Sequence, residues 1–428
     1  MKMKKVLALG LAVAMTATMF VGCGSKKDDS SSTTTNNDSK GGKQSVELKV
    51  WCSSNDQDFT KKMGDKFNQE NDKYDVKFTF NTVGEDKAKE QIEKDPKSIA
   101  DVFLLPSDQL RDLAAGGYLR DLSALDTLGL KTEGVFEAHA LASCKYNDKL
   151  SAVPYTYNML ILFYNKSMLN ETEVTKLETI MAKNIGAGVK NFAVDVGNGF
   201  YNNMFFAANG CQLYGADGKD PKTVTWNTPA GISVVKYLNN LVKSPKFHKP
   251  ANNDHETLLK DGKLAAYVGG SWDVANMKKV LGDNYGATVL PTINIDGADK
   301  PLKPFAAFKL VGVNQATKNA EAAATFAYFM ASKEVQELRL KERGYAPTVT
   351  ELVSQTYEDP AISALINQAK ETNSVLTPQA ENFGNFWTPA GAIGDKIYKK
   401  EKDMQNDAGI KKALDSAVAS MTANANKK

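Results

Sequence analysis

The chain has 428 residues, with 53 Lys and Arg against 50 Asp and Glu, which gives a formal net charge of +3. The basic residues are dispersed along the chain rather than gathered in stripes, and this argues against a nucleic-acid-binding protein. The part that follows residue 45 is too long for one small core, so the length favours two lobes.

The first residues predict export. Lys2, Lys4 and Lys5 precede a predominantly apolar stretch over residues 6–21, and a polar stretch follows it. A membrane-spanning helix needs roughly 20 apolar residues. A shorter apolar run behind basic residues is typical of a secretory signal peptide. We therefore predict a signal peptide over residues 1–22.

A lone cysteine ends this segment. The stretch FVGCG over residues 20–24 resembles a bacterial lipobox, although Phe20 stands where Leu is usual. The resemblance implies that Cys23 is lipidated and becomes the mature N-terminus, because two acyl chains anchor a protein firmly. Residues 23–45 are polar and predict a disordered tether. We expect a lipoprotein on the extracellular face of the cytoplasmic membrane; the alternative is a secreted protein in which Cys23 is incidental.

Strands and helices alternate in the first part of the folded chain, as in an α/β fold with a parallel sheet. Apolar and polar residues alternate over 46–52, and Phe59, Met63 and Phe67 are four apart on one helix face. The predicted elements are strands at 46–52, 76–83 and 100–105, a helix through residues 59–67, and a helix from Ser107 as its N-cap to Gly116 and Gly117.

The alternation restarts after residue 155. Thr228 as cap and Pro229 in the first turn are typical of a helix start. The predicted elements are strands at 159–164, 191–196 and within 304–314, and helices at 200–208, from 229 to 241 and within 318–340, followed by a helical C-terminal part.

Sequence signatures of catalysis are absent. The chain has no phosphate-binding loop, nucleophile elbow or dinucleotide fingerprint, and no spacing of carboxylates singles out a glycosidase pair. The three histidines, His139, His248 and His255, are far apart in the sequence, so we expect no metal and no cofactor. Three cysteines besides Cys23 show no C-x-x-C spacing, and whether any of them pair stays open; they are Cys52, Cys144 and Cys211. A surface glycoside hydrolase or lyase and a structural adhesin remain as other classes.

Aromatic and carboxylate residues stand at the ends of predicted strands, where open α/β sheets bind ligands. A sugar offers an apolar C–H face and a rim of hydroxyls, so its site needs flat aromatic rings beside polar groups. The residues in such positions are Trp51, Asp56, Asp108, Tyr155, Tyr157, Trp272 and Trp387. This pattern predicts a carbohydrate-binding site.

Several segments resemble one family. The segment LLKDGKLAAYVGGSW, then YGATVLPTI, NQATKNAEAAATFAYFM and GYAPTV, resemble successive blocks of the family-1 extracellular solute-binding proteins of ABC importers. The resemblance implies a periplasmic-binding-protein-like fold, in which two α/β lobes joined by hinge-crossing strands enclose a cleft. It implies one lobe of residues 46–155 plus 310–358 and another of 156–309 plus 359–428. It also implies a monomer that closes on its ligand and delivers it to the permease subunits.

Within this family the chain is similar to maltose/maltodextrin-binding proteins, which implies a malto-oligosaccharide ligand. By that resemblance Phe200, Trp272 and Trp387 stack on glucose rings, and Asp108 and Asp56 accept hydrogen bonds from hydroxyls. The other ligand-facing positions are Trp51, Tyr155, Tyr157, Asn158 and Phe386. Three departures, at Leu105, Gln109 and Asn158, leave a β-linked ligand such as a xylo- or cello-oligosaccharide as the alternative.

Overall fold

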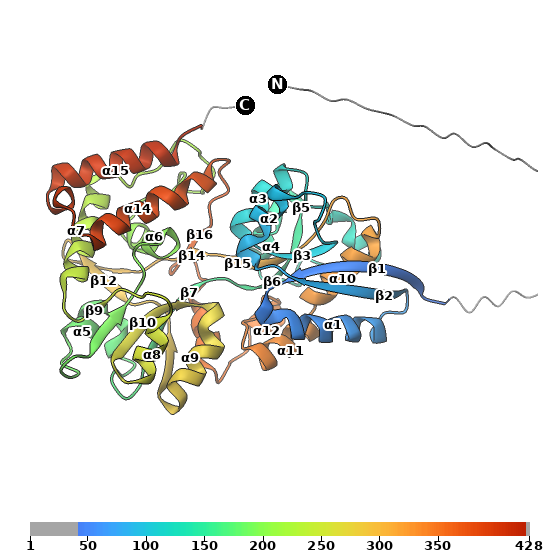
Figure 1. Ribbon diagram of the computed structural model, residues 1–428, viewed down its shortest axis with the longest axis horizontal. Coiled ribbons are helices and arrows are strands. Elements are labelled where there is room, and N and C mark those ends of the chain that lie inside the picture. Colours follow the sequence, from blue (N-terminus) through green and yellow to red (C-terminus); the bar gives the residue numbers. More distant parts are fainter. Residues whose placement is uncertain (1–41, 425–428) are drawn as a thin grey trace, which may run out of the picture. The chain divides into compact units, whose positions relative to one another are not determined.

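The computed structural model describes residues 42–424 (Figure 1). The predicted signal peptide, Cys23 and residues 23–41 of the predicted tether lie outside the described residues. None of the helices within 42–424 is long and apolar enough to cross a membrane.

The N-terminal part of the described chain builds a five-stranded sheet. Its strand order is β2-β1-β3-β15-β6, and its members are β1 (Gln44–Cys52), β2 (Tyr74–Thr82), β3 (Val102–Pro106), β6 (Ala152–Tyr157) and β15 (Phe308–Val313). β1 pairs in parallel with β2 and β3. β15 comes from much later in the chain and pairs antiparallel with both β3 and β6 (Figure 1). The sheet is therefore completed by a segment that returns to it.

Periodicity predicted β1, β2, β3 and the first helix correctly, and β15 lies within the strand predicted over 304–314. The strand β6 was not predicted, and the sheet is mixed and not parallel, because β15 is antiparallel to both of its neighbours. In α1 (Gln57–Glu70) the side chains of Phe59, Met63 and Phe67 are all buried. The prediction for Ser107 was wrong in detail: α3 (Ser107–Ala115) begins at Ser107, and Pro106 is its N-cap. The Ser107 hydroxyl accepts instead from the backbone N–H of Phe308 at 3.1 Å. The remaining helices of this part are α2 (Ala88–Lys94), α4 (Ala138–Ala142), α10 (Ala320–Ala331), α11 (Lys333–Arg343) and α12 (Thr350–Val353).

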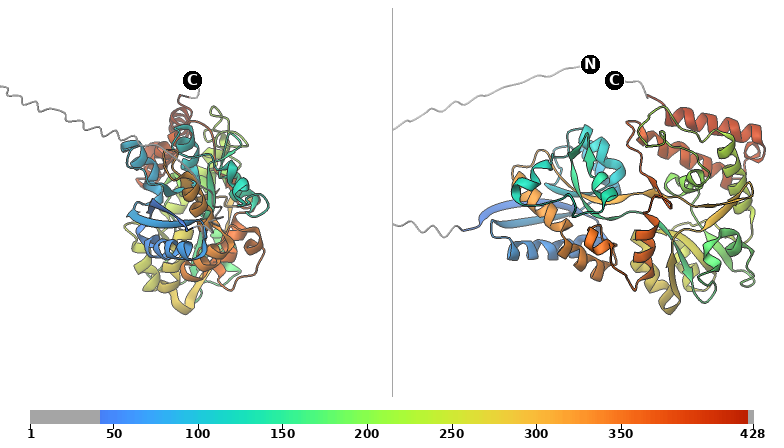
Figure 2. Two further views of the ribbon diagram at one scale, coloured as in Figure 1. Left: turned by 90° about the vertical axis from the view of Figure 1, so that its right-hand side faces the viewer. Right: turned by 180° about the vertical axis from the view of Figure 1, so that it is seen from behind.

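A second five-stranded sheet has the order β11-β7-β10-β8-β9. Its strands are β7 (Leu160–Asn165), β8 (Lys190–Ala193), β9 (Phe247–His248), β10 (Leu264–Gly270) and β11 (Tyr285–Thr288). Its helices are α5 (Leu177–Ala182), α6 (Gly199–Ala208), α7 (Pro229–Lys243), α8 (Asp254–Lys260), α9 (Val274–Leu281), α13 (Pro360–Gln368), α14 (Trp387–Tyr398) and α15 (Asp407–Met421). In the views of Figures 1 and 2, α14 and α15 lie side by side. α14 packs against α6 and α7, and α15 packs against α7.

Two predicted helices differ locally from expectation. The stretch 318–340 forms two helices, because Ser332 has extended backbone angles and its hydroxyl caps α11. At the start of α7, Thr228 is the N-cap residue, as predicted, but its hydroxyl donates to the carbonyl of Thr225 at 2.8 Å instead of capping. Behind α7, the rings of Trp226 and Phe206 stack at 3.7 Å between centroids in the core of the second sheet.

Short segments connect the two sheets. β6 ends at Tyr157 and β7 begins at Leu160. β14 (Phe305–Ala306) leads into β15 and pairs in parallel with β16 (Val375–Leu376). The backbone N–H of Asn158 donates to the carbonyl of Ala307 at 2.8 Å, which ties two of these connections together. The smaller strands β4 (Lys145–Tyr146), β5 (Lys149–Leu150), β12 (Thr292–Ile295) and β13 (Ala298–Pro301) form two hairpins.

All three cysteines of the described part are free and buried, which answers the question that the sequence left open. Burial raises the pKa of Cys52 to about 11 and that of Cys211 to about 12. Between residues 42 and 424 no group of three or more His, Cys, Asp or Glu side chains is placed to hold a metal ion.

Candidate functional site

Aromatic side chains from four separate segments form one cluster. The ring of Phe200 lies 6.0 Å from Trp272 and 6.0 Å from Phe305 between centroids, and Phe305 lies 6.2 Å from Trp387. Phe386 packs beneath Trp387 at 5.0 Å and is fully buried. Trp272 is 38% exposed, and Phe200 and Trp387 are partly exposed. The cluster therefore presents three accessible aromatic rings on a buried aromatic base.

Local structure fixes the two ends of the cluster. Phe200 occupies the first turn of α6, where Asn198 accepts from the backbone N–H of Phe200 at 2.9 Å. Trp272 follows β10 in a tight turn, in which the Asp273 carboxylate accepts from the N–H of Gly270 at 3.0 Å. A β-carbon on Gly270 would lie 2.2 Å from the Trp272 ring, so the indole requires glycine at this position. Burial raises the pKa of Asp273 to about 6.

Charged groups gather at one edge of the first sheet, where the parallel strands end. Asp56 follows β1 and Glu85 follows β2, while Lys309 lies in β15. The Lys309 ammonium lies 3.0 Å from the Glu85 carboxylate, and an Asp56 oxygen lies 3.2 Å from the guanidinium of Arg343. Tyr345 lies between the two cations, 5.5 Å from Lys309 and 5.7 Å from Arg343. We call these five residues the charged group.

Burial and pairing oppose each other inside the charged group. Burial lowers the pKa of Lys309, but the charge of Glu85, with Tyr345 and Asp56, outweighs it, and the net direction is upward. For Arg343, burial also lowers the pKa, but Tyr345 and the charge of Asp56 outweigh it, and the net direction is again upward. Neither oxygen of Asp56 has a hydrogen-bond partner within the described chain, although its side chain is fully buried. The charged group therefore holds both cations in their charged form and leaves the acceptor capacity of Asp56 unused.

Asp108 lies on a helix that contacts two of the segments of the site. It occupies the first turn of α3, and burial raises its pKa to about 6. Further along α3, the guanidinium of Arg111 donates to the carbonyl of Glu381 at 3.3 Å, in the segment that leads to Trp387. Ser107 at the start of α3 accepts from Phe308, three residues after Phe305. The helix that carries Asp108 thus contacts two of the four segments that supply the aromatic cluster, those of Phe305 and Trp387.

Several residues predicted to face the ligand are buried. Trp51 is 6% exposed and packs 6.2 Å from Phe103. Tyr155 is fully buried, with the guanidinium of Arg339 3.4 Å from its ring centroid. Tyr157 packs 5.2 Å from Phe308. A ring stacks on a sugar only through an accessible face, and none of these three rings offers one in this structure.

The structure also shows the surroundings of the three residues that depart from the family pattern. Leu105 is fully buried in β3. The side chain of Gln109 is hydrogen-bonded at both ends. Its oxygen accepts from the N–H of Lys89 at 3.0 Å, and its nitrogen donates to the carbonyl of Asp86 at 2.8 Å. Asn158 is partly exposed at the crossing between the sheets. Of the three, Asn158 alone offers a side chain that is not already occupied or buried.

Sequence reasoning missed five members of this arrangement: Glu85, Lys309, Arg343, Tyr345 and Phe305. No local motif marks them, because they lie in different segments and converge only through the order of the strands. The position of Glu85 directly after a strand was the one available signal.

The chain is similar to known proteins in both sequence and fold. Residues 62–364 match the family described as bacterial extracellular solute-binding protein. The chain is 26% identical to a maltooligosaccharide ABC transporter solute-binding lipoprotein of Streptococcus pneumoniae, over 95% of this chain and 96% of that protein. It is also 26% identical to a galactooligosaccharide-binding protein of Bacillus subtilis, over 98% and 97%. The ligand-free structure of a maltodextrin-binding protein from L. casei BL23 superposes with a TM-score of 0.79 at 29% identity, covering 89% of this chain and 99% of that one.

Proposed function

Because the chain belongs to the bacterial extracellular solute-binding proteins, we propose that it captures malto-oligosaccharides outside the cell and delivers them to the permease of an ABC importer. Its relatives are substrate-binding proteins of ABC transporters, so the chain is a binding protein and not an enzyme. A glycoside hydrolase is thereby excluded, and the fold is the two-lobed α/β fold of the maltodextrin-binding proteins.

The observation that carries the proposed ligand is the aromatic cluster with its accessible ring of Trp272. In the proposed complex Phe200, Trp272 and Trp387 stack on the apolar faces of successive glucose rings. Asp108 and Asn158 accept or donate hydrogen bonds at the hydroxyl rim. Asp56 is fully buried in the charged group, so a hydroxyl would reach its free acceptor positions only if hinge movement opened that group.

We also propose the movement that accompanies binding. One lobe comprises residues 46–155 plus 310–358 and the other 156–309 plus 359–428, with the short connections between the sheets as the hinge. Closing the hinge would remove the sugar from water and create the surface that the permease recognises. Scattering with and without maltotetraose tests this part, because closure reduces the radius of gyration, whereas a rigid protein keeps it unchanged.

The proposed location is the outer face of the cytoplasmic membrane, with a monomer held by lipid on Cys23. A relative named as a lipoprotein supports this. The test is mass spectrometry of the mature N-terminus together with the variant Cys23→Ser. Lipidation predicts an acylated Cys23 and release of the serine variant into the medium. An N-terminus at another residue would contradict the anchor.

Calorimetry with maltose, maltotriose and maltotetraose tests the ligand. We expect binding that Trp272→Ala weakens by about 2 kcal/mol, roughly 30-fold, because large aromatic anchors dominate such sites. Leu128→Ala is the matched control, since Leu128 is 38% exposed, as Trp272 is, and lies outside the cluster. The absence of heat throughout the series, in a protein that unfolds cooperatively, would overturn the α-glucan ligand.

A second ligand class has its own support. The galactooligosaccharide-binding relative matches the chain as broadly as the maltooligosaccharide-binding one does, and Gln109 is engaged internally where the family pattern has an arginine. The alternative is therefore a differently linked oligosaccharide, including galacto-, xylo- and cello-oligosaccharides. Titrating these sugars beside the maltodextrins decides between the two classes.

A further inference from the structure

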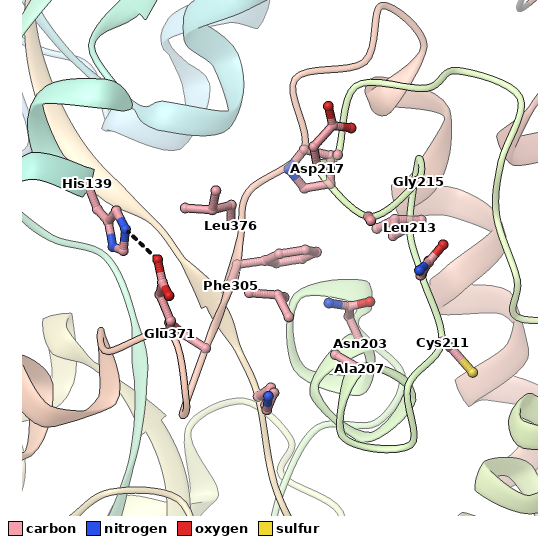
Figure 3. Close-up of a pocket in the computed structure, with 17 residues that line it drawn as sticks. His139, Asn203, Ala207, Cys211, Leu213, Gly215, Asp217, Phe305, Glu371 and Leu376 are labelled. Atoms are coloured by element: carbon pink, nitrogen blue, oxygen red, sulfur yellow. Dashed lines mark ion pairs between the residues drawn. The ribbon is translucent and has the colours of Figure 1, made fainter.

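A cavity of about 310 Å³ lies apart from the accessible faces of the aromatic cluster (Figure 3). Its walls come from α6, from the loop after α6, from β14 and β16, and from α4. None of the ten residues predicted to bind ligand lines it. Phe305 forms part of its wall and at the same time contacts Phe200 and Trp387, so one ring separates the cavity from the cluster.

An amide without a partner among the described residues faces this cavity. Asn203 is only 3% exposed, and its side chain makes no hydrogen bond with any described residue. Figure 3 shows the amide directed from α6 into the cavity. The neighbouring Asn202 shows the contrast, since its nitrogen donates to the carbonyls of Val196 at 3.1 Å and Ala390 at 2.8 Å. Neither atom of the Asn203 amide is among the fully enclosed polar atoms that lack a partner, so both atoms are open to the cavity and free to hydrogen-bond to a ligand that has donors and acceptors.

The charges of the lining nearly cancel. Glu371 lies 3.6 Å from the imidazole of His139 across the cavity, as the dashed line in Figure 3 marks. Asp217 adds a second carboxylate, and Lys303 adds an ammonium that forms no ion pair within residues 42–424. A strongly charged ligand would therefore meet a like charge on one side. An uncharged ligand with several hydroxyls can use the amide, the ammonium and both carboxylates.

The apolar lining and the volume of the cavity further limit the class of ligand that it can bind. Phe305 provides an aromatic wall, and the apolar side chain of Leu376 is 54% exposed at the mouth. The volume of about 310 Å³ is at the lower limit of the range of about 300–1,000 Å³ that is usual for small-molecule sites. A chain of several sugar rings does not fit such a volume, whereas one ring does.

We propose that this cavity is a second binding site, which takes a single monosaccharide-sized polyol. Its hydroxyls hydrogen-bond to Asn203, Lys303 and Asp217, and its apolar face lies against Phe305 and Leu376. The site is independent of the proposed oligosaccharide site, because it uses none of that site's contact residues.

The test uses the full chain, with D-glucose as the probe and saturation-transfer NMR or calorimetry as the readout. We expect weak glucose binding that Asn203→Leu reduces about tenfold, the effect of losing a hydrogen-bonding group worth about 1.4 kcal/mol. Trp272→Ala should leave this binding unchanged. Asn203→Leu should fold at least as well as the parent, because it removes an unpartnered buried amide, and a thermal scan checks this. Lys303→Met is the second variant and should weaken glucose binding in the same direction.

The outcomes separate this proposal from the proposed function. Glucose binding that is lost in Trp272→Ala and kept in Asn203→Leu would place the sugar in the aromatic cluster and overturn the second site. No binding at millimolar glucose, or an Asn203→Leu variant that is more stable but binds glucose as the parent does, would also overturn it, because the amide would then hold only water. Failure of maltodextrin binding would leave the glucose result unaffected.

Discussion

The Lys309–Glu85 ion pair permits a quantitative test of the charged group. Its atoms are 3.0 Å apart, and each side chain is 11% exposed. At an effective dielectric constant of about 20, the attraction at that distance is about 5.5 kcal/mol. Desolvation of two ions offsets most of this attraction, so the pair as a whole contributes little. Removing one partner, however, leaves an uncompensated buried charge.

We therefore expect Lys309→Met to lower the free energy of unfolding by about 3–5 kcal/mol. The double variant Lys309→Met/Glu85→Gln should recover most of that loss, because neither side chain is then a buried unpaired ion. The assay is urea unfolding followed by tryptophan fluorescence, carried out as a double-mutant cycle. The matched control is Lys77→Met, which breaks an ion pair of 2.9 Å between Lys77 and Glu47 that is almost fully exposed; it should change the stability very little.

Two results would refute this reasoning. If Lys309→Met costs no more than the exposed control does, the charged group is hydrated and not a buried network. If the double variant is as unstable as the sum of the single variants, the two charges do not compensate each other, and Lys309 has another partner among its neighbours.

Three further predictions follow from burial and titration. Sugar affinity should be full above pH 6 and fall as the pH drops through about 6, because hydroxyl donors favour the ionised form of Asp108, whose pKa is about 6; Asp108→Asn should bind more weakly and lose the pH dependence, as calorimetry at several pH values can show. Trp226→Ala should cost about 3–5 kcal/mol of stability, since the indole is fully buried against Phe206, whereas Trp272→Ala should cost much less in the same urea assay. A thiol reagent at pH 8 should modify the native protein only slowly and the urea-unfolded protein at once, at the buried cysteines Cys52, Cys144 and Cys211.

Helices and strands with a regular apolar pattern could be predicted from the sequence, because each spacing of apolar residues is typical of one kind of element. α1 has its apolar residues four apart, and β3 is a continuous apolar run buried on both faces. The prediction for Trp51 shows the limit of such patterns. Trp51 alternates with the buried residues of β1 and so looked accessible, but Phe103 of the adjacent strand covers it. Alternation identifies a solvent face only when nothing packs on that face.

The aromatic half of the candidate site was predictable, because its residues stand in loops with Gly, Asn and Pro, away from periodic apolar faces. The charged half was not. Lys309 lies in a strand whose partners are β3 and β6, so its distance from Glu85 follows from strand order and not from sequence spacing. The buried cavity behind Phe305 depends in the same way on segments from four parts of the chain. Local patterns carry no information about such convergence.

The segment from Phe305 to Lys309 contributes residues to the aromatic cluster, to the cavity and to the charged group. Phe305 contacts the rings of Phe200 and Trp387 and lines the cavity, and Lys309 belongs to the charged group. The same few residues lead from β14 into β15, where the chain passes from one sheet to the other. A hinge motion that changes the backbone angles of this segment must move the aromatic cluster relative to the charged group. If the proposed ligand contacts both groups, it favours one hinge position by the difference in its affinity for the two arrangements. The proposed sugar recognition and the proposed hinge movement would then be parts of one equilibrium.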